Sequence, residues 1–372
     1  MKNGWRTRRL GEVLEVQNGF AFDSKAFNPS KGMPLIRIRD LKRGTETETR
    51  FDGEYDRKYV VSAGDLLIGM DGEFGCYEWK GSPALLNQRV CRLQGFASDL
   101  LPRFVFYGVN SHLKVIEEDT SYTTVKHLSS RQVLGIEFPV PRLPDQQRIV
   151  GVLDDAFEGI ATAKANAEKN LQNARALFET HLQSVFIKRG EGWVEKTVDQ
   201  ISTNLDSKRI PITKSDRKVG KYPYYGASGI VDYVADYIFD GDALVVSEDG
   251  ANLLMRSTPI AFSVSGKYWV NNHAHILKFE NMVTQRFVEF YLESIKLDEY
   301  IRGAAQPKLT QKALNSIPIS IPKSVTERAK IVERIELLSG ETRRLESLYE
   351  RKLAVLEKLR KSLLDQAFSG EL

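Results

Sequence analysis

Arginine and side-chain amide groups on predicted loops could read base pairs, because Arg pairs with guanine and Asn or Gln with adenine in the major groove. Arg37 and Arg39 are two residues apart, so in a strand they would share one face. Tyr222, Tyr224 and Tyr225 could stack on bases or lie half in the core. Each candidate could equally be a solvated surface residue. The candidates for DNA contact are Gln17, Asn18, Arg37, Arg39, Gln88, Arg89, Tyr122, Lys126, Lys208, Arg209, Tyr225, Ser228, Asn271, Asn272, His273, Gln306 and Lys308.

Other reactive groups give weaker signals. His273 and His275 could bind a metal ion, but no third ligand is evident from the spacing, which favours a strand. Residues 226–229 are glycine-rich but lack the Lys-Ser/Thr of a phosphate-binding loop, so a turn is the simpler interpretation. Glu248 and Asp249 could form an acid/base pair, although beside a glycine they more simply make a turn. We therefore predict no metal site and no catalytic residue.

Composition describes a globular chain. The 372 residues are 42% hydrophobic with a mean hydropathy of −0.33, and no apolar run approaches the ~18 residues that a membrane helix needs. Cys76 and Cys91 lack a Cys-x-x-Cys partner and are expected to be buried thiols in the reducing cytoplasm. The net charge of +4 would not by itself nominate a nucleic-acid binder, whose usual footprint is more basic.

The chain repeats itself once, at about half its length. Residues 136–141 recur as residues 317–322, and Leu182–Phe186 recurs as Leu364–Phe368, 182 positions later. Such a repeat implies two similar units and an internal pseudo-two-fold. Duplex DNA is the commonest partner with a matching two-fold, so a duplicated reader suggests a two-part site.

Each repeat begins with a domain of mixed α and β character. In residues 1–144, a glycine-aspartate pair introduces the apolar run Leu66–Met70. In residues 190–322, another such pair introduces Ala243–Val246. Short apolar runs that close at turn residues predict strands. Matching short helices are expected to begin near Phe104 and Phe287. Because neither a regular βαβ alternation nor a sandwich rhythm is present, we predict an α+β fold.

A long amphipathic helix is expected after each domain, over residues 145–189 and 323–372. Apolar residues recur three or four positions apart without an intervening proline, and ~44 helical residues span roughly 65 Å. A helix this long with one apolar stripe needs a long partner, and a two-fold between the repeats would make the pair antiparallel. The first stripe is Ile149, Leu153, Ala156, Ile160, Ala163, Ala167, Leu171, Ala174, Phe178, Leu182 and Val185, and it is alanine-rich where the second is leucine-rich.

Four segments together resemble type I restriction–modification specificity subunits. Pro141–Val150 is similar to the start of the family's long helix, where the prolines keep the chain extended and Asp145 can cap the helix. Leu363–Leu372 is similar to the family's C-terminus. Gly303–Leu309 and Lys221–Ile230 are similar to elements of its target-recognition domains. These similarities occur in order, in a duplicated frame that covers nearly the whole chain.

The resemblance implies two α/β target-recognition domains separated by two long antiparallel helices that form a coiled-coil spacer. It implies a non-catalytic subunit that binds a bipartite duplex-DNA target, with one half-site per domain. The partners would be two adenine methyltransferase subunits and two motor-nuclease subunits. These partners, not this chain, would bind S-adenosylmethionine, ATP and Mg²⁺. Contacts with them are expected at Gln146, Gln147 and Arg148.

The two copies differ in ways that bear on these expectations. Residues 122–128 of the first copy are unlike residues 304–309 of the second, which fits two domains that read different sequences. In the second copy Thr326–Arg328 stands where the first has its Gln-Gln pair, so partner contacts need not be identical. Two other functions stay open on sequence alone. One is a coiled-coil scaffold with protein-binding end domains, and the other is a hydrolase that uses Glu248 and Asp249.

Overall fold

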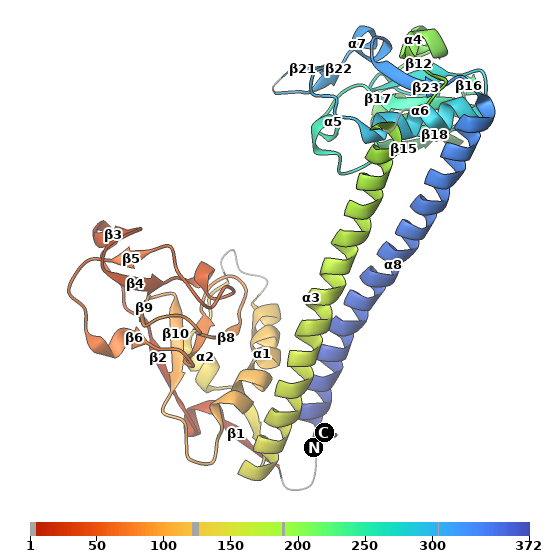
Figure 1. Cartoon of the computed structure of the whole chain (residues 1–372). Coiled ribbons are helices and arrows are strands. Elements are labelled where there is room, and N and C mark those ends of the chain that lie inside the picture. Colours follow the sequence, from red (N-terminus) through yellow and green to blue (C-terminus); the bar gives the residue numbers. More distant parts are fainter. Residues whose placement is uncertain (1–4, 121–125, 188–189, 304) are drawn as a thin grey trace. The chain divides into compact units, whose positions relative to one another are not determined.

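The computed structural model describes residues 5–120, 126–187, 190–303 and 305–372 (Figure 1). The chain divides into two compact units, one formed by residues 1–166 with 353–372 and the other by residues 167–352. Each unit contains one mixed α/β domain and parts of two long helices.

The first domain is built on an antiparallel four-stranded sheet in the order β2-β10-β7-β8. A five-stranded sheet has the order β3-β5-β4-β9-β6, in which β4 and β9 run parallel, and β1 pairs with β11. The strands are β1 Arg6–Arg9, β2 Glu15–Asn18, β3 Phe27–Asn28, β4 Met33–Ile36, β5 Arg50–Phe51, β6 Val60–Val61, β7 Leu66–Gly69, β8 Cys76–Glu78, β9 Ala84–Leu86, β10 Val90–Gln94 and β11 Glu137–Val140. The α-helices are α1 Pro102–Asp119 and α2 Ser130–Leu134.

The second domain has the four-stranded sheets β13-β20-β17-β18 and β15-β14-β19-β16, and the pairs β12-β23 and β21-β22. Its strands are β12 Trp193–Thr197, β13 Thr203–Asn204, β14 Val219–Gly226, β15 Gly229–Val234, β16 Phe239–Asp240, β17 Ala243–Ser247, β18 Ala261–Val264, β19 Lys267–Val270, β20 Ala274–Lys278, β21 Ile301–Arg302, β22 Lys308–Leu309 and β23 Pro318–Pro322. Its α-helices are α4 Val198–Ile201, α5 Asn252–Met255, α6 Met282–Ser294 and α7 Gln311–Asn315.

The two domains share one plan, which confirms the internal repeat. The sheet order β2-β10-β7-β8 corresponds to β13-β20-β17-β18, and the pair β1-β11 corresponds to β12-β23. The parallel pair β4–β9 corresponds to β14–β19. Helices α1 and α6 each follow the four-stranded sheet along the chain, where the sequence predicted matching helices. The predicted α+β class with two mixed domains is therefore confirmed.

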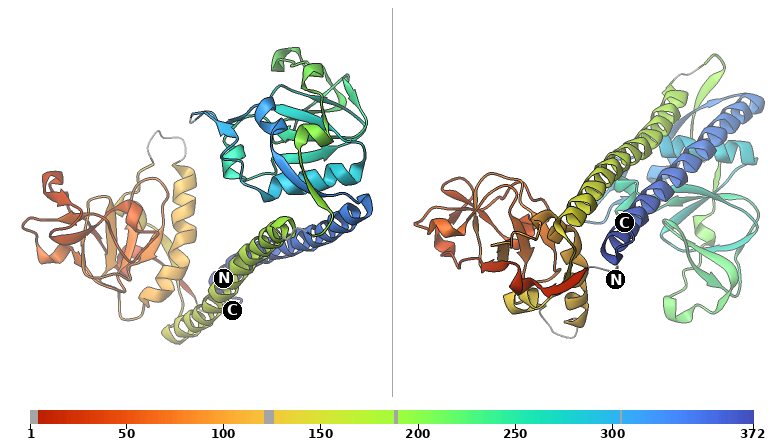
Figure 2. Two further views of the ribbon diagram at one scale, coloured as in Figure 1. Left: turned by 45° about the horizontal axis from the view of Figure 1, so that its top comes forward. Right: turned by 90° about the horizontal axis from the view of Figure 1, so that it is seen from below.

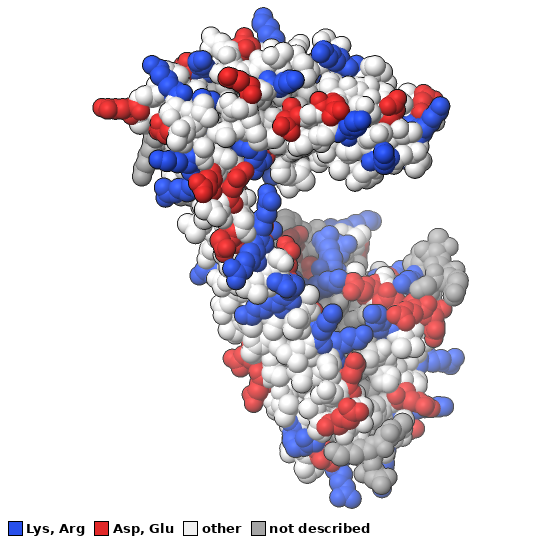
Figure 3. Space-filling model, turned by 90° about the vertical axis from the view of Figure 1, so that its right-hand side faces the viewer, with Lys and Arg blue, Asp and Glu red and all other residues white. Residues whose placement is uncertain are grey.

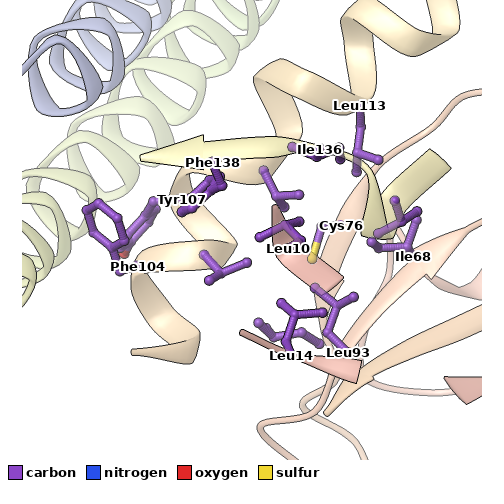
Figure 4. Packing of buried hydrophobic residues seen from close by; sticks show 14 of the residues in the cluster. Leu10, Leu14, Ile68, Cys76, Leu93, Phe104, Tyr107, Leu113, Ile136 and Phe138 are labelled. Carbon is purple, nitrogen blue, oxygen red and sulfur yellow. The ribbon is translucent and has the colours of Figure 1, made fainter. Parts of the chain in front are cut away.

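The core of the first domain lies between α1, β11 and the four-stranded sheet (Figure 4). Phe104 of α1 packs edge-on against Phe138 of β11, with ring centroids 5.8 Å apart. Cys76 and Cys91 lie in this core with 3% and 0% of their surface exposed, as predicted for buried thiols. Burial raises the pKa of both thiols, that of Cys91 to about 12.

The two long helices, α3 Leu143–Ile187 and α8 Val325–Ser369, have 45 residues each. Helix α3 begins two residues before the expected 145–189, so Asp145 lies in its first turn instead of capping it. Gly370, with φ of 83°, ends α8 in the left-handed region that glycine adopts readily.

The helices pair antiparallel in each unit (Figure 2). In the first unit, Lys164 of α3 bonds Glu357 of α8 at 2.9 Å, and Phe368 near the end of α8 packs against Phe104 with ring centroids 4.9 Å apart. In the second unit, Arg175 of α3 bonds Glu346 at 2.7 Å. There the later residue Phe186 joins a core cluster with Ile335 from the first part of α8.

The predicted apolar stripe of α3 is buried or half-buried along its length. Ala167 and Ala174 are 1% and 9% exposed, so small side chains lie where the helices meet and allow a close approach. Among the described helices, none combines the length and apolar composition needed to cross a membrane.

Candidate nucleic-acid interface

In the first domain, three segments meet where strand β7 ends. Met70 N donates to Arg89 O at 3.0 Å, which fixes the turn between β9 and β10 beside this strand end. Asp71 forms an antiparallel bridge with His127. The Asp71 carboxylate lies 3.2 Å from Arg89 Nη1 and 2.7 Å from His127 Nδ1. One carboxylate therefore holds two side chains that come from separate loops.

The second domain repeats the backbone part of this arrangement where strand β17 ends. Glu248 N donates to His273 O at 2.9 Å, which fixes the turn between β19 and β20. Asp249 forms an antiparallel bridge with Lys308. The Asp249 carboxylate lies 2.9 Å from His273 Nδ1.

The same backbone contacts relate the two arrangements, although their side chains differ. We call each an aspartate turn: Asp71 with Arg89 and His127 in the first domain, and Asp249 with His273 and Lys308 in the second. Arg89 corresponds to His273, and His127 corresponds to Lys308. These four side chains are 50–56% exposed, so each presents its outer part to solvent.

The loop after β4 lies close to the first aspartate turn. Strand β4 ends at Ile36, and Arg37 begins the 3₁₀ helix Ile38–Asp40, whose terminal carboxylate accepts from Arg37 N at 2.9 Å. This corrects the expectation that Arg37 and Arg39 share a strand face. Arg39 and Asp71 line the same pocket, which has a volume of about 150 Å³. Arg39 is exposed and remains a candidate for DNA contact.

The corresponding loop of the second domain follows β14. Ser228 is exposed there, whereas Tyr225 is half-buried and packs edge-on against Tyr268, with ring centroids 5.9 Å apart. Asn271 is only 7% exposed, and its Oδ1 accepts from His273 N at 2.8 Å. This corrects the expectation of a base contact at Asn271, whose side chain shapes the turn that displays His273.

The other candidates differ in their surroundings. Gln17 and Lys126 are held within their own domain: Gln17 Oε1 accepts from Arg92 Nη2 at 2.6 Å, and Lys126 Nζ donates to Glu117 Oε1 at 3.0 Å. Tyr122 lies outside the described residues. The exposed candidates are Asn18, Gln88, Lys208, Asn272 and Gln306.

Asp71, Asp249 and His127 are the residues of the aspartate turns that the sequence candidates did not include. Each aspartate follows an apolar strand and precedes a glycine, so alignment of the two repeats could have revealed both aspartates and, opposite Lys308, His127.

A buried cluster of charged side chains adjoins the second aspartate turn. His275 is 1% exposed, with Nδ1 2.6 Å from Asp206 Oδ2. Glu248 accepts from Arg209 Nη1 at 2.6 Å and lies 3.1 Å from Lys308 Nζ. Burial alone would raise the pKa of Asp206, but the hydrogen bond from His275 keeps that pKa below its usual range. The pKa of Glu248 is lowered in the same way. Burial alone would raise it, but the hydrogen bond from Arg209 contributes to holding it below its usual range.

The same cluster contains three side chains of the kinds that bind metal ions. Ligand atoms of Asp206, Glu248 and His275 lie within 4.8 Å of one another. However, two side-chain cations already contact Glu248, and His275 Nε2 is 2.7 Å from Leu309 O. We therefore interpret the group as an ion-pair cluster. Arg209 also bonds Ala274 O at 2.7 Å, which corrects the expectation that it reads bases.

Surface charge is mixed on the face drawn in Figure 3. Basic and acidic side chains are interspersed over the face seen in Figure 3, in keeping with a net charge of only +4. The aspartate turns stand out by geometry instead, because each displays side chains from two loops at one strand end.

The start of α3 was expected to contact partner subunits. Gln147 and Arg148 are exposed, and Arg148 Nη2 donates to Leu372 O at 2.7 Å. Gln146 is fully buried: its Nε2 donates to the Asp99 and Pro141 carbonyls, and its Oε1 accepts from Leu101 N, all at 2.8 Å. This corrects the expectation of a partner contact at Gln146.

Replacing Gln146 with alanine is expected to lower the free energy of unfolding of the first domain by roughly 2–3 kcal/mol, because three buried or part-buried backbone groups lose their partner. The control Gln147→Ala alters an exposed side chain and should change this free energy by less than about 0.5 kcal/mol. Urea unfolding measures both. A Gln146→Ala chain of unchanged stability that no longer held its partners would restore the interface role.

Comparison with known protein families gives two matched regions. Residues 2–172 and 190–353 each match the family described as "Type I restriction modification DNA specificity domain". The two matches cover both mixed domains and the greater part of both long helices.

Curated relatives and solved structures agree with this match. The chain is 28% identical over 418 aligned residues to the type I restriction enzyme EcoBI specificity subunit of Escherichia coli, covering 100% of this chain and 86% of that one. It is 34% identical over 173 residues to a putative type I restriction enzyme specificity subunit, S.HindORF215P, of Haemophilus influenzae, covering 46% and 43%. The fold resembles the HsdS subunit of Thermoanaerobacter tengcongensis, with a TM-score of 0.60, 18% identity and coverage of 100% and 98%. It also resembles a chain from a study of assembly of the type I R-M system, with a TM-score of 0.78, 18% identity and coverage of 100% and 99%.

Proposed function

The chain belongs to the type I restriction–modification DNA specificity family, and we propose that it selects a bipartite duplex-DNA target for its complex. Residues 1–144 and 190–322 are the recognition domains, and each reads one half-site. The paired helices α3 and α8 act as the spacer between them. The chain itself is non-catalytic and acts in the cytoplasm.

The observation that carries this proposal is the duplicated aspartate turn. A single chain presents the same backbone arrangement twice, with Arg89 and His127 in one copy and His273 and Lys308 in the other. The two turns share a backbone arrangement but carry side chains with different hydrogen-bonding groups. They therefore suit two half-sites of different sequence, since proteins distinguish base pairs by their hydrogen-bond patterns. Gln88 and Asn272 are exposed on the same two turns and are further base-reading candidates.

The partners in this proposal are two adenine methyltransferase subunits and two motor-nuclease subunits. The internal repeat supports two equivalent docking positions, and Gln147 and Arg148 are exposed candidates for contact. S-adenosylmethionine, ATP and Mg²⁺ would be bound by the partners. A net charge of +4 supplies few phosphate contacts, so the partners contribute much of the affinity for DNA.

The decisive experiment is selection from random duplexes by the assembled complex, together with methylome sequencing of the source cell. We expect enrichment of two short sequences at a constant gap, with methylated adenines in the target. A coiled-coil scaffold would enrich no sequence.

Modularity gives a sharper prediction. Replacing residues 1–144 with the equivalent domain of a relative of different specificity should change one half-site and leave the other half-site and the gap unchanged. The reason is that each domain has its own sheets and its own aspartate turn. The same selection measures the outcome, with replacement of residues 190–322 as the matched control. A simultaneous change in both half-sites would refute the assignment of one half-site to each domain.

A further inference from the structure

We infer that Asp71 holds Arg89 as a guanine reader in the half-site of the first domain. This inference rests on the proposed function and adds to it the base and the residues that read it. Arg89 makes the base contact, and Asp71 is a positioning residue. The second domain lacks this reader, since His273 stands in the place of Arg89.

The first step is that the turn is fixed before DNA arrives. Met70 N donates to Arg89 O at 3.0 Å, and Val90 N donates to Asn87 O at 2.9 Å. Asn87 Oδ1 also accepts from Gln88 N at 2.8 Å. The backbone at Arg89 is thus tied to the residue that follows β7 and closed by two hydrogen bonds within its own turn, so little conformational freedom remains to be lost on binding.

The second step concerns the side chain of Arg89, which is 56% exposed while its partner Asp71 is 27% exposed. Both contacts to the carboxylate use Nη1, at 3.2 and 3.4 Å. Within the described part of the chain, the Nε and Nη2 groups of Arg89 have no hydrogen-bond partner, and they form one edge of the planar guanidinium. That edge matches the O6 and N7 acceptors that guanine presents in the major groove.

The third step concerns the carboxylate. Asp71 also lies 2.7 Å from His127 Nδ1, so a second contact restrains the orientation of its carboxylate. An anchored guanidinium loses fewer rotamers when it binds a base, which favours the correct base over alternatives. A free arginine at the same place would serve a phosphate equally well, because a phosphate contact tolerates many orientations.

The second domain shows why the two half-sites should differ at this position. His273 Nδ1 faces the Asp249 carboxylate at 2.9 Å, which leaves Nε2 as its outward group. A carboxylate accepts a hydrogen, so in the neutral ring Nδ1 carries the proton and Nε2 is an acceptor. A single acceptor cannot make the two-donor contact that an arginine makes with guanine.

The test uses the chain assembled with its partners and duplexes that carry each of the four bases at every position of the selected target. The wild-type chain should prefer guanine at one position of the first half-site by roughly tenfold to a hundredfold. Arg89→Lys keeps the charge but loses the paired donors, so this preference should fall to a few-fold. Asp71→Asn should weaken the same preference by roughly tenfold and spare the other positions. Asp249→Asn is the matched control, and it should leave this position unchanged.

The outcomes separate the inference from the function on which it rests. A wild-type chain that selects no two-part sequence would overturn the proposed function. A two-part target whose first half-site contains no guanine, or an Arg89→Lys chain with the full preference, would overturn only the inference. A third result would also overturn only the inference: an Arg89→Ala chain whose affinities for selected and scrambled duplexes fall by the same factor, with the log–log salt slope flattened by about one unit. That result would identify Arg89 as a phosphate contact.

Discussion

Replacing Asp206 with alanine is expected to lower the free energy of unfolding of the second domain by about 3–5 kcal/mol, the usual result of breaking a buried ion pair from one side. The Asp206 carboxylate accepts from His275 Nδ1 at 2.6 Å and from Ile276 N at 2.9 Å, and it is 3.5 Å from Arg209 Nη2. His275 Nε2 faces the Leu309 carbonyl at 2.7 Å, which holds the ring in place. Without Asp206, Ile276 N would stay buried and unpaired, and His275 Nδ1 would keep only the more distant Glu248 carboxylate, 3.8 Å away.

The first domain provides the matched control. Its cross-strand pair Asn18 and Cys91 occupies the positions of Asp206 and His275 in the equivalent sheet. The double variant Asp206→Asn with His275→Cys installs that neutral pair, and it should recover most of the lost stability. Amide hydrogen exchange in β20 measures the effect, with β10 as the internal reference. A loss below 1 kcal/mol in the single variant, or an equal loss in the double variant, would contradict this account.

The same cluster predicts how stability depends on pH. The pKa of Asp206 is lowered in the folded chain: burial opposes this shift, and the hydrogen bond and charge of His275 outweigh the burial. A lowered pKa in the folded state stabilises the fold above the pKa of the unfolded chain, about 3.9 for aspartate. That stabilisation is lost as the pH falls through the lower, folded value. Acid unfolding of the wild-type second domain should therefore be steeper than that of the double variant.

Local patterns predicted the long elements because those elements depend on local spacing. The 3–4 apolar spacing placed α3 and α8, and its positions on α3 are buried or half-buried, among them Leu153 and Ala167. The apolar runs after the glycine-aspartate pairs became strands β7 and β17. Each of these elements is set by residues within a few positions of one another.

The candidate interface was harder to predict, since its contacts join residues far apart in the sequence. Asp206 and His275 are 69 residues apart, and the burial of Arg209 follows from that pairing. Gln146 has the polarity of a surface residue, but its amide donates to the Asp99 carbonyl, 47 positions earlier in the sequence, and is buried there. Arg37 alternates with apolar neighbours as a strand residue would, but the Asp40 carboxylate bonds its N–H and starts a 3₁₀ turn. What the sequence did offer was the pair of Asp-Gly steps at 71 and 249, which mark both aspartate turns.

Lengthening both long helices by seven residues is expected to widen the gap between half-sites by about three base pairs. Seven helical residues add about 10 Å, and the duplex rises 3.4 Å per base pair. Residues 160–166 of α3 and 355–361 of α8 are the segments to duplicate, because Lys164 and Glu357 lie opposite each other at 2.9 Å. A seven-residue insertion keeps the apolar stripe on one face of each helix.

Affinity for the original target should fall on the order of a thousandfold, because only one half-site can then be engaged and each lost base pair costs about 1–3 kcal/mol. Selection from random duplexes by the assembled complex measures the new gap, and competition with the original duplex measures the loss. Duplicating residues 160–166 alone is the control: the unequal helices can no longer pair along their length, so that chain should lose thermal stability and acquire no new gap. An altered half-site sequence at an unchanged gap would show that the helices do not set the spacing.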